Sequence, residues 1–240
     1  MTWNSFRTPA GRDVPAVTAA EMREVDRVAV DEVGLQLLQM MENAGRALAW
    51  HVHRVRDENG TVVIGAGNGG NGGGGMACAR HLTNRDVPVR IVLDRPSEEL
   101  SGAAAEQYRI LDEMSVPMTT DTNEISHEEP SVVVDALIGY GLDGTVRPPA
   151  SELIDAMNQQ LSPVVSLDVP SGIDATTGEI LGSAVTPDRT VTLALPKPGL
   201  GTIRGTVYLA DIGIPRTVYE RLGIEYEPPF GDADWVRLEK

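Results

Sequence analysis

The chain has 240 residues, of which 41% are hydrophobic, enough to build the core of one large domain or two small ones. Its formal net charge of -15 disfavours nucleic-acid binding, because an acidic surface repels phosphate backbones, yet backbone N–H groups can still hold a small phosphorylated ligand. Cys78 is the single cysteine, so no internal disulfide can form, and no stretch approaches the ~20 apolar residues of a membrane span. We therefore expect a cytoplasmic protein without membrane or nucleic-acid partners.

The first part of the chain predicts an irregular lead-in followed by two helices. Residues 1–17 show no regular pattern, but Thr18 and Glu21 then give the capping-box pattern that begins a helix. Apolar residues recur at helical spacing after this cap, until Gly34 breaks the helix. A second pattern of the same kind predicts a helix over residues 35–55.

The rest of the chain alternates strand and helix patterns. Short apolar runs of the buried-strand type occur at residues 62–64, 87–93, 132–136, 164–167, 190–195 and 207–210. Helical patterns occur at residues 76–82, 98–114 and 150–160. This alternation predicts an α/β fold in which helices cover both faces of a mostly parallel sheet. No linker divides the chain, so we expect one domain over residues 1–240, with a tail after Pro228 that is a loose strand or disordered.

A glycine-rich segment lies where the first of these strands meets the next helix. It runs from Gly65 to Gly75, and the predicted helix starts at Met76. Glycines have no Cβ and permit positive φ, so successive N–H groups can converge on an anion, and the helix start adds partial positive charge. The segment contains G-x-G-x-x-G but no Gly-Lys-Ser/Thr. It therefore predicts a cradle for a nucleotide-like ligand rather than a P-loop, with a flexible surface loop as the alternative.

Two aspartates end buried strands further along the chain. Asp135 closes the run 132–136, and Asp168 follows the run 164–167, with Ser171 three residues later. A carboxylate at such a position is costly unless it is paired or bound to a metal, and these hard oxygen donors suit an alkali or alkaline-earth cation. The alternative is that these side chains only cap the turns that follow. The four histidines form neither a triad nor a zinc-binding pattern.

Five separated motifs together resemble the YjeF N-terminal domain family. They are Thr18-Ala-Ala-Glu-Met-Arg-Glu-Val-Asp-Arg27, Met41-Glu-Asn-Ala-Gly45, the glycine segment, the loop from Asp135 to Gly144, and Asp168-Val-Pro-Ser-Gly-Ile-Asp174. The resemblance covers a core of about residues 17–215. It implies a three-layer αβα Rossmann-like sandwich, preceded here by the N-terminal helical extension, and a homodimer.

The best-known members of that family are NAD(P)H-hydrate epimerases. The resemblance implies epimerisation of the R and S forms of hydrated NADH and NADPH at C6 of the nicotinamide ring, followed by a separate dehydratase in the same repair pathway. It also implies a potassium ion held by Asn71, Asp135 and Ser171. Substrate contacts would fall on Gly70, Asn71, Gly72, Gly73 and Gly74, on Gly139, Tyr140, Gly141, Leu142, Asp143, Gly144 and Thr145, and on Asp168.

The chemistry of this reaction gives Asp168 a role. Loss of hydroxide from C6, beside the ring nitrogen, leaves an iminium-like cation that water can attack on either face. We expect Asp168 to be the main acid/base and the cation to order the loops as a template. Lys197, in Leu-Pro-Lys-Pro-Gly at the end of a strand, either approaches a phosphate or carboxylate or lies on the surface by chance.

The chain also departs from the family pattern G-P-G-N-N-G-G-D-G. Its loop has two extra residues, and Gly74 replaces the family's aspartate, so a non-catalytic or re-purposed nucleotide-binding domain is the alternative function. An NAD-dependent dehydrogenase is disfavoured, because Asp94, the nearest candidate for an acidic ribose ligand, lies nearly thirty residues beyond Gly65. The chain stops at Lys240, and we expect no C-terminal dehydratase domain.

Overall fold

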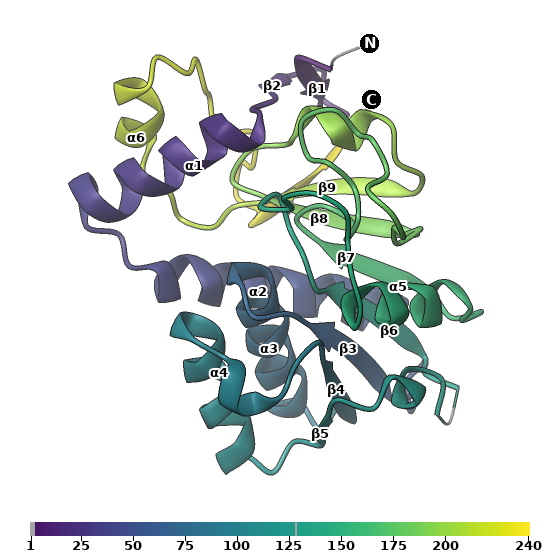
Figure 1. Ribbon diagram of the computed structural model, residues 1–240. Helices are drawn as coiled ribbons and strands as arrows, with labels where there is room; N and C mark the ends of the chain where they lie inside the picture. The colour runs from purple at the N-terminus through teal and green to yellow at the C-terminus, as the bar shows by residue number, and fades with distance from the viewer. Residues whose placement is uncertain (1–2, 128) are drawn as a thin grey trace.

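The central element of the fold is an eight-stranded sheet (Figure 1). The computed structural model describes residues 3–127 and 129–240, so residues 1 and 2 of the predicted lead-in lie outside it. The strands of the sheet are β3 (Val62–Ala66), β4 (Val89–Leu93), β5 (Met118–Thr119), β6 (Val132–Ala136), β7 (Val164–Leu167), β8 (Arg189–Leu193), β9 (Thr206–Ala210) and β10 (Trp235–Leu238). Their order is β10-β9-β8-β7-β6-β3-β4-β5, and within the described residues only β10 runs antiparallel to its neighbour. The predicted α/β fold with a mostly parallel sheet is confirmed.

Helices cover both faces of this sheet, as the strand sequences require. Helices α2 (Leu37–Val55), α3 (Gly70–Thr83) and α4 (Gly102–Glu113) lie on one face, and α5 (Ala150–Asn158) lies on the other (Figure 1). Within β3, Val62 and Ile64 pack into the core under the first group, whereas Val63 packs into the core under α5. Successive side chains of a strand point to opposite faces, so a run that is apolar throughout is buried on both sides.

The N-terminal region is more regular than the sequence predicts. Strands β1 (Ser5–Arg7) and β2 (Asp13–Pro15) pair into a small antiparallel sheet in place of the irregular lead-in. Helix α1 (Ala19–Arg27) begins at the predicted capping box, in which Thr18 and Glu21 each accept a hydrogen bond from the backbone N–H of the other. The helix continues as a π-helical segment, Val28–Val33, and ends at Gly34, whose φ of 83° an L side chain rarely adopts. The break predicted at Gly34 is therefore confirmed.

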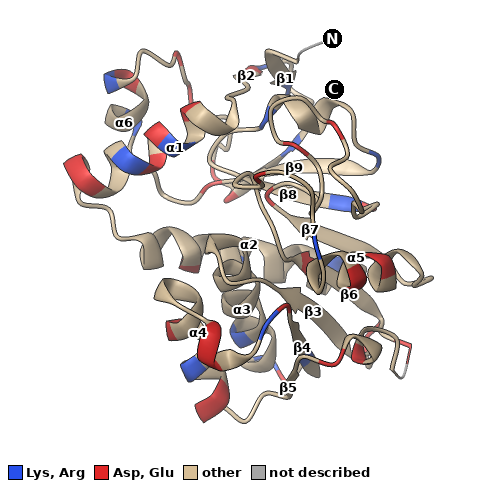
Figure 2. Cartoon of the chain, viewed as in Figure 1, with Lys and Arg blue, Asp and Glu red and all other residues tan. Residues whose placement is uncertain are grey.

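Other elements connect and extend the sheet. Helix α6 (Arg216–Arg221) packs against the segment that follows α1, and β10 gives the tail after Pro228 an ordered strand (Figure 1). Short 3₁₀ helices lie at Ser97–Glu99, Thr122–Ile125 and Pro198–Gly201. Charged residues lie mainly on outer elements such as α1, α4 and α6, while the centre of the molecule carries few of them (Figure 2). No helix in the described part of the chain is long and apolar enough to cross a membrane.

Helix α3 starts six residues earlier than the sequence predicts. The predicted loop ends at Gly75, but the structure begins the helix at Gly70. Close packing explains why glycines occupy its first turns: a Cβ at Gly72 would lie 1.7 Å from the Gly67 carbonyl oxygen, and one at Gly73 would lie 2.6 Å from Met41. Most of the glycine segment therefore brings a helix close to its neighbours, its first two residues belong to β3, and only residues 67–69 form a loop.

Candidate active site

The loops at the carboxyl ends of the strands surround a cavity of about 930 Å³. Residues from the ends of β3, β4, β6, β7 and β8 line it, together with Met22 and Asp26 of α1 and Met40 and Met41 of α2. This is the edge at which open α/β sheets bind their ligands. The volume lies towards the top of the range of about 300–1,000 Å³ that small-molecule and cofactor sites occupy.

Asp168 lies in the wall of this cavity in a strained backbone conformation. Its φ is 65°, and its N–H donates to the carbonyl of Val191 at 2.7 Å. Its carboxylate accepts a hydrogen bond from the Tyr140 backbone N–H at 3.0 Å and from Lys197 Nζ at 2.5 Å. A positive φ in a non-glycine residue costs free energy and is retained where the surroundings enforce it, often in functional sites. The structure thus fixes this carboxylate from both its backbone and its side chain.

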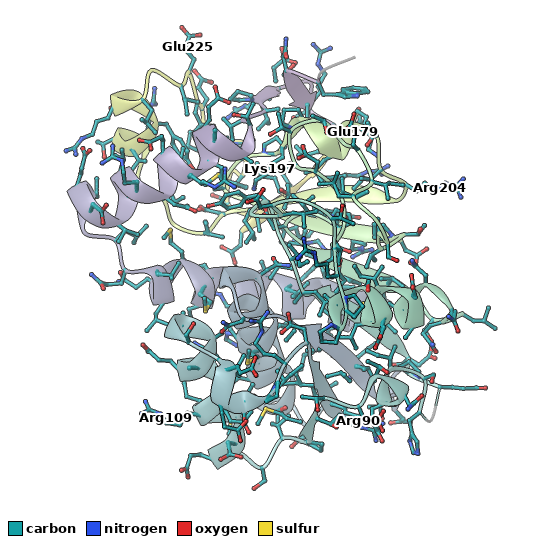
Figure 3. The ribbon with its side chains drawn as sticks, viewed as in Figure 1. Arg90, Arg109, Glu179, Lys197, Arg204 and Glu225 are labelled. Atoms are coloured by element: carbon teal, nitrogen blue, oxygen red, sulfur yellow. The ribbon has the colours of Figure 1, made fainter. Side chains whose placement is uncertain are left out.

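Lys197 is the buried partner of Asp168. Only 1% of its side chain is exposed, and its ammonium also donates to the Leu193 carbonyl at 2.9 Å and lies 5.5 Å from the centre of the Tyr140 ring. Figure 3 shows Lys197 in the interior of the molecule, whereas Arg109 and Arg204 project outward. Of the two interpretations of this lysine, contact with a carboxylate is confirmed. The signal in the sequence was its position at the end of a buried strand.

A second carboxylate, Asp26, faces the same cavity from α1. It accepts a hydrogen bond from the hydroxyl of Tyr140, and burial raises the pKa of the Asp26 carboxyl above its usual value. Asp26 lies one helical turn after Met22, so both residues present the same face to the cavity. Asp26 is not among the site residues predicted from the sequence, although it lies within the N-terminal motif, because its partner is 114 positions away in the chain.

Asp135 and Ser171 form a buried network beside the cavity. The Asp135 carboxylate accepts hydrogen bonds from the Ser171 backbone N–H at 2.9 Å, from Ser166 Oγ at 2.8 Å and from the Ser171 hydroxyl. Burial raises the pKa of Asp135, and these hydrogen bonds oppose the increase. The Ser171 hydroxyl also accepts from the Ile138 N–H at 2.9 Å, so the network joins the loops after β6 and β7. The structure thus brings together Asp135 and Ser171, two of the three residues that the family resemblance assigns to a cation.

The residues of the predicted cation site fit a monovalent ion in their chemistry. Asp135, Ser171 and the carbonyl of Ile138 are hard oxygen donors within one network, and they carry one carboxylate charge. Asn71 has a buried Nδ2 atom with no hydrogen-bond partner, and its Oδ1 lies 3.0 Å from where a Cβ at Gly139 would be. The Asp168 Oδ2 atom lies at the same distance from that point. The glycine therefore keeps open a polar cradle between Asn71 and Asp168.

The predicted substrate contacts divide into two groups. Those that line the cavity are Gly70, Asn71, Gly139, Tyr140, Gly141, Leu142, Asp143, Gly144, Thr145 and Asp168. Gly72, Gly73 and Gly74 instead lie buried inside α3, outside the cavity lining. A Cβ at Gly74 would lie 2.7 Å from Leu167 Cδ2, so the position where the family has aspartate is a packing contact here. The cavity also contains Arg23, Asp94, Arg95 and Arg147, which sequence analysis did not select.

The fold and this cavity define an α/β protein with a ligand site at the carboxyl edge of its sheet and a buried acid–base pair in the wall. The chain belongs to the YjeF N-terminal domain family: the model of the family described as YjeF-related protein N-terminus matches residues 37–199. An NAD(P)H-hydrate epimerase from Dehalogenimonas lykanthroporepellens is 43% identical over 239 residues, covering 97% of this chain and 96% of that protein.

Two further comparisons extend this result. The bifunctional NAD(P)H-hydrate repair enzyme Nnr from Salinibacter ruber is 37% identical over 86% of this chain, which spans 42% of that longer protein. The crystal structure of the yeast protein ynu0 superposes with a TM-score of 0.82 and 27% identity, over 93% of this chain and 100% of the yeast chain. The resemblance stated from the five sequence motifs is confirmed.

Proposed function

We propose that this chain interconverts the R and S forms of hydrated NADH and NADPH at C6 of the nicotinamide ring. The observation that carries the proposal is the Asp168–Lys197 ion pair in the wall of a cavity large enough for a dinucleotide. The full-length similarity to an NAD(P)H-hydrate epimerase supports the same reaction. A non-catalytic binding role has no observation in its favour, because the replacement at Gly74 alters a packing contact outside the cavity.

The ion pair supplies what the reaction requires. The C6 hydroxyl takes up a proton and leaves as water, while the lone pair of the ring nitrogen forms the C=N bond of the iminium. Water then adds to the other face and returns a proton to Asp168, the group that supplied the first one, so protons balance over the two steps. Asp168, held by Lys197 at 2.5 Å, is placed to exchange this proton with the substrate as acid and then base, and to stabilise the cation between the two steps. Tyr140 and Asp26 form a further polar pair that faces the same space.

The proposal includes a potassium ion held by Asn71, Asp135 and Ser171. A bound cation would supply positive charge that orders the loops after β6 and β7 against the glycine segment. Hydrogen bonds between Asp135 and Ser171 join those loops at the same place. The proton transfers assigned to Asp168 do not pass through this ion.

A coupled assay tests the proposed function. R-NADHX is mixed with a dehydratase that accepts only the S form, and the return of NADH absorbance is followed with and without this protein, in potassium and in sodium buffers. The protein should accelerate the return of NADH. In Asp168→Asn, loss of the acid–base group should lower kcat/KM by about 100-fold or more. A wild-type protein that gives no acceleration in either salt would refute the epimerase function, and full activity in the variant would remove Asp168 from the mechanism.

The remaining partner assignments follow from the same proposal. The S-specific dehydratase that completes the repair is a second activity, as in the bifunctional relatives. A homodimer in the cytoplasm is part of the proposal, and light scattering at several protein concentrations measures its assembly. A monomer at all concentrations would contradict the dimer without affecting the proposed reaction.

A further inference from the structure

Asp94 lies where dinucleotide-binding folds place the acidic residue that binds the ribose. It follows β4 directly, and its N–H donates to the carbonyl of Ala66 at 3.1 Å, at the end of β3 where the glycine segment starts. In the sequence its long separation from Gly65 argues against this role. In space, however, it lies beside the loop, at the carboxyl end of the strand next to β3, which is the position of the ribose-binding acid in Rossmann folds.

Asp94 forms an unusual pair with its neighbour Arg95 in the cavity. The guanidinium donates two hydrogen bonds to the carboxylate, at 2.9 and 3.0 Å. The Asp94 side chain is only 7% exposed, whereas that of Arg95 is 37% exposed, and both residues line the cavity. The pair thus consists of a buried acceptor covered by a cation that can turn towards solvent.

The distance from this pair to Asp168 suits a dinucleotide. In the sheet, β4 and β7 are separated by β3 and β6, so their carboxyl ends lie three strand spacings, or about 14 Å, apart. A molecule with its nicotinamide ring at Asp168 and its pyrophosphate over the start of α3 would place its second ribose near Asp94. The single cavity contains both ends.

We propose that Asp94 and Arg95 form the subsite that reads the 2′ position of the adenosine ribose. Asp94 accepts a hydrogen bond from the 2′-hydroxyl of the NADH form, and Arg95 turns from Asp94 onto the 2′-phosphate of the NADPH form. The pair therefore lets one site take both substrates. This inference deepens the proposed function and rests on it for the choice of dinucleotide.

Substitutions at the two residues should shift the substrate preference in opposite directions. In Arg95→Ala, the phosphate loses its ion pair and faces Asp94, so kcat/KM should fall at least about tenfold more for NADPHX than for NADHX. In Asp94→Asn, kcat/KM for NADHX should fall severalfold more than that for NADPHX. Arg109→Ala is the matched control, since Arg109 lies exposed on α4 outside the cavity and loses the same charge (Figure 3). Equal losses for both substrates in Arg95→Ala would overturn the inference.

Binding of fragments tests the subsite apart from catalysis. Isothermal titration with adenosine 2′,5′-bisphosphate and with AMP should show tighter binding of the bisphosphate to the wild type and to Arg109→Ala, and loss of that preference in Arg95→Ala. If the preference survives in Arg95→Ala, the subsite lies elsewhere, even if the epimerase assay succeeds. If the preference is lost as expected but no epimerisation occurs, the subsite stands and the proposed reaction fails.

Discussion

Lys197 has an unusual environment for a lysine, because its side chain is buried and lysine is rarely buried unless it is paired. Here the ammonium is enclosed and held by Asp168 and the Leu193 carbonyl. Removing one member of a buried ion pair leaves the other charge without compensation. In Lys197→Met, the free energy of unfolding should therefore fall by about 3–5 kcal/mol, measured by urea denaturation, and epimerase activity should fall with it.

A double variant separates two causes of the loss in stability, the unpaired charge of Asp168 and the loss of packing around Lys197. In Asp168→Asn combined with Lys197→Met, no buried charge remains, so stability should exceed that of Lys197→Met alone. A double variant that is as unstable as the sum of the two single changes would show that packing, not charge, sets the cost.

Among single residues, the sequence predicts the site residues that directly follow strands. It does not predict those whose contacts join distant parts of the chain. Asp135 and Ser171 meet in one network and Asp168 lines the cavity nearby, because parallel strands all end at one edge of the sheet. Asp26 could not be selected, since its contact with Tyr140 depends on how α1 crosses the cavity. Local pattern carries no information about such a crossing.

Helix α3 shows how an element can be misassigned when glycine has two uses. A glycine run predicts a loop by its conformational freedom, yet here it permits α3 to lie close against α2 and the sheet. The same close approach occurs from the α2 side, where a Cβ at Gly45 would lie 2.5 Å from the Cβ of Ala77 and 2.9 Å from that residue's backbone carbon. The short distance between α2 and α3 is therefore possible only because glycine has no Cβ at these positions.

Alanine substitution in the two helices should have opposite effects. Gly45→Ala forces α2 away from the backbone of α3, so we expect a loss of about 1–3 kcal/mol despite the better helix propensity of alanine. Gly70→Ala is the control, because Gly70 is the first residue of α3 and nothing lies within 4 Å of its Cβ position. The free energy of unfolding of this variant should stay level or rise by up to about 1 kcal/mol. Thermal unfolding of both variants gives the comparison, and equal changes would argue against close packing.

Elements with a strong local signal are predicted well, and weak ones are not. The capping box at Thr18 and the apolar runs of β6 and β7 match the structure to the residue. Strand β5 and helix α6 are absent from the sequence-based prediction, because two and six residues give too short a pattern. Their places are decided by neighbours already in the fold.

At the scale of the whole molecule, the formal net charge of -15 affects stability through repulsion between surface charges. Charge of one sign destabilises a compact state by self-repulsion, and salt at about 1 M shortens the screening length to about 3 Å. The Tm at neutral pH should therefore rise by roughly 2–8 °C between low and high NaCl, since in a chain of this size each 1 kcal/mol of stability changes Tm by about 2–4 °C.

The pH provides the control for this effect. At about pH 5 the carboxylates carry less charge, so the same NaCl increase should give a smaller shift. A shift of equal size at both pH values would assign the stabilisation to general salt exclusion from the surface. NaCl rather than KCl keeps the proposed potassium site out of the comparison.

The order of the strands is a property of the whole chain that no segment of its sequence contains. Alternation predicts parallel pairing, but it does not say that β3 lies between β4 and β6, or that the tail returns beside β9. That order brings Asp94 and Lys197, which follow strands far apart in the sequence, into the lining of one cavity. The composition of the ligand site is thus decided by topology as much as by motifs.

Part of the cavity wall comes from helix α1, which lies outside the part of the chain that matches the family model. The family match begins at residue 37, whereas Met22, Arg23 and Asp26 of the cavity wall lie before it. Two relatives could therefore agree throughout that core and still offer different surroundings to the nicotinamide ring. Differences in substrate handling among these proteins are therefore to be sought also in the first thirty-six positions, which the family match does not include.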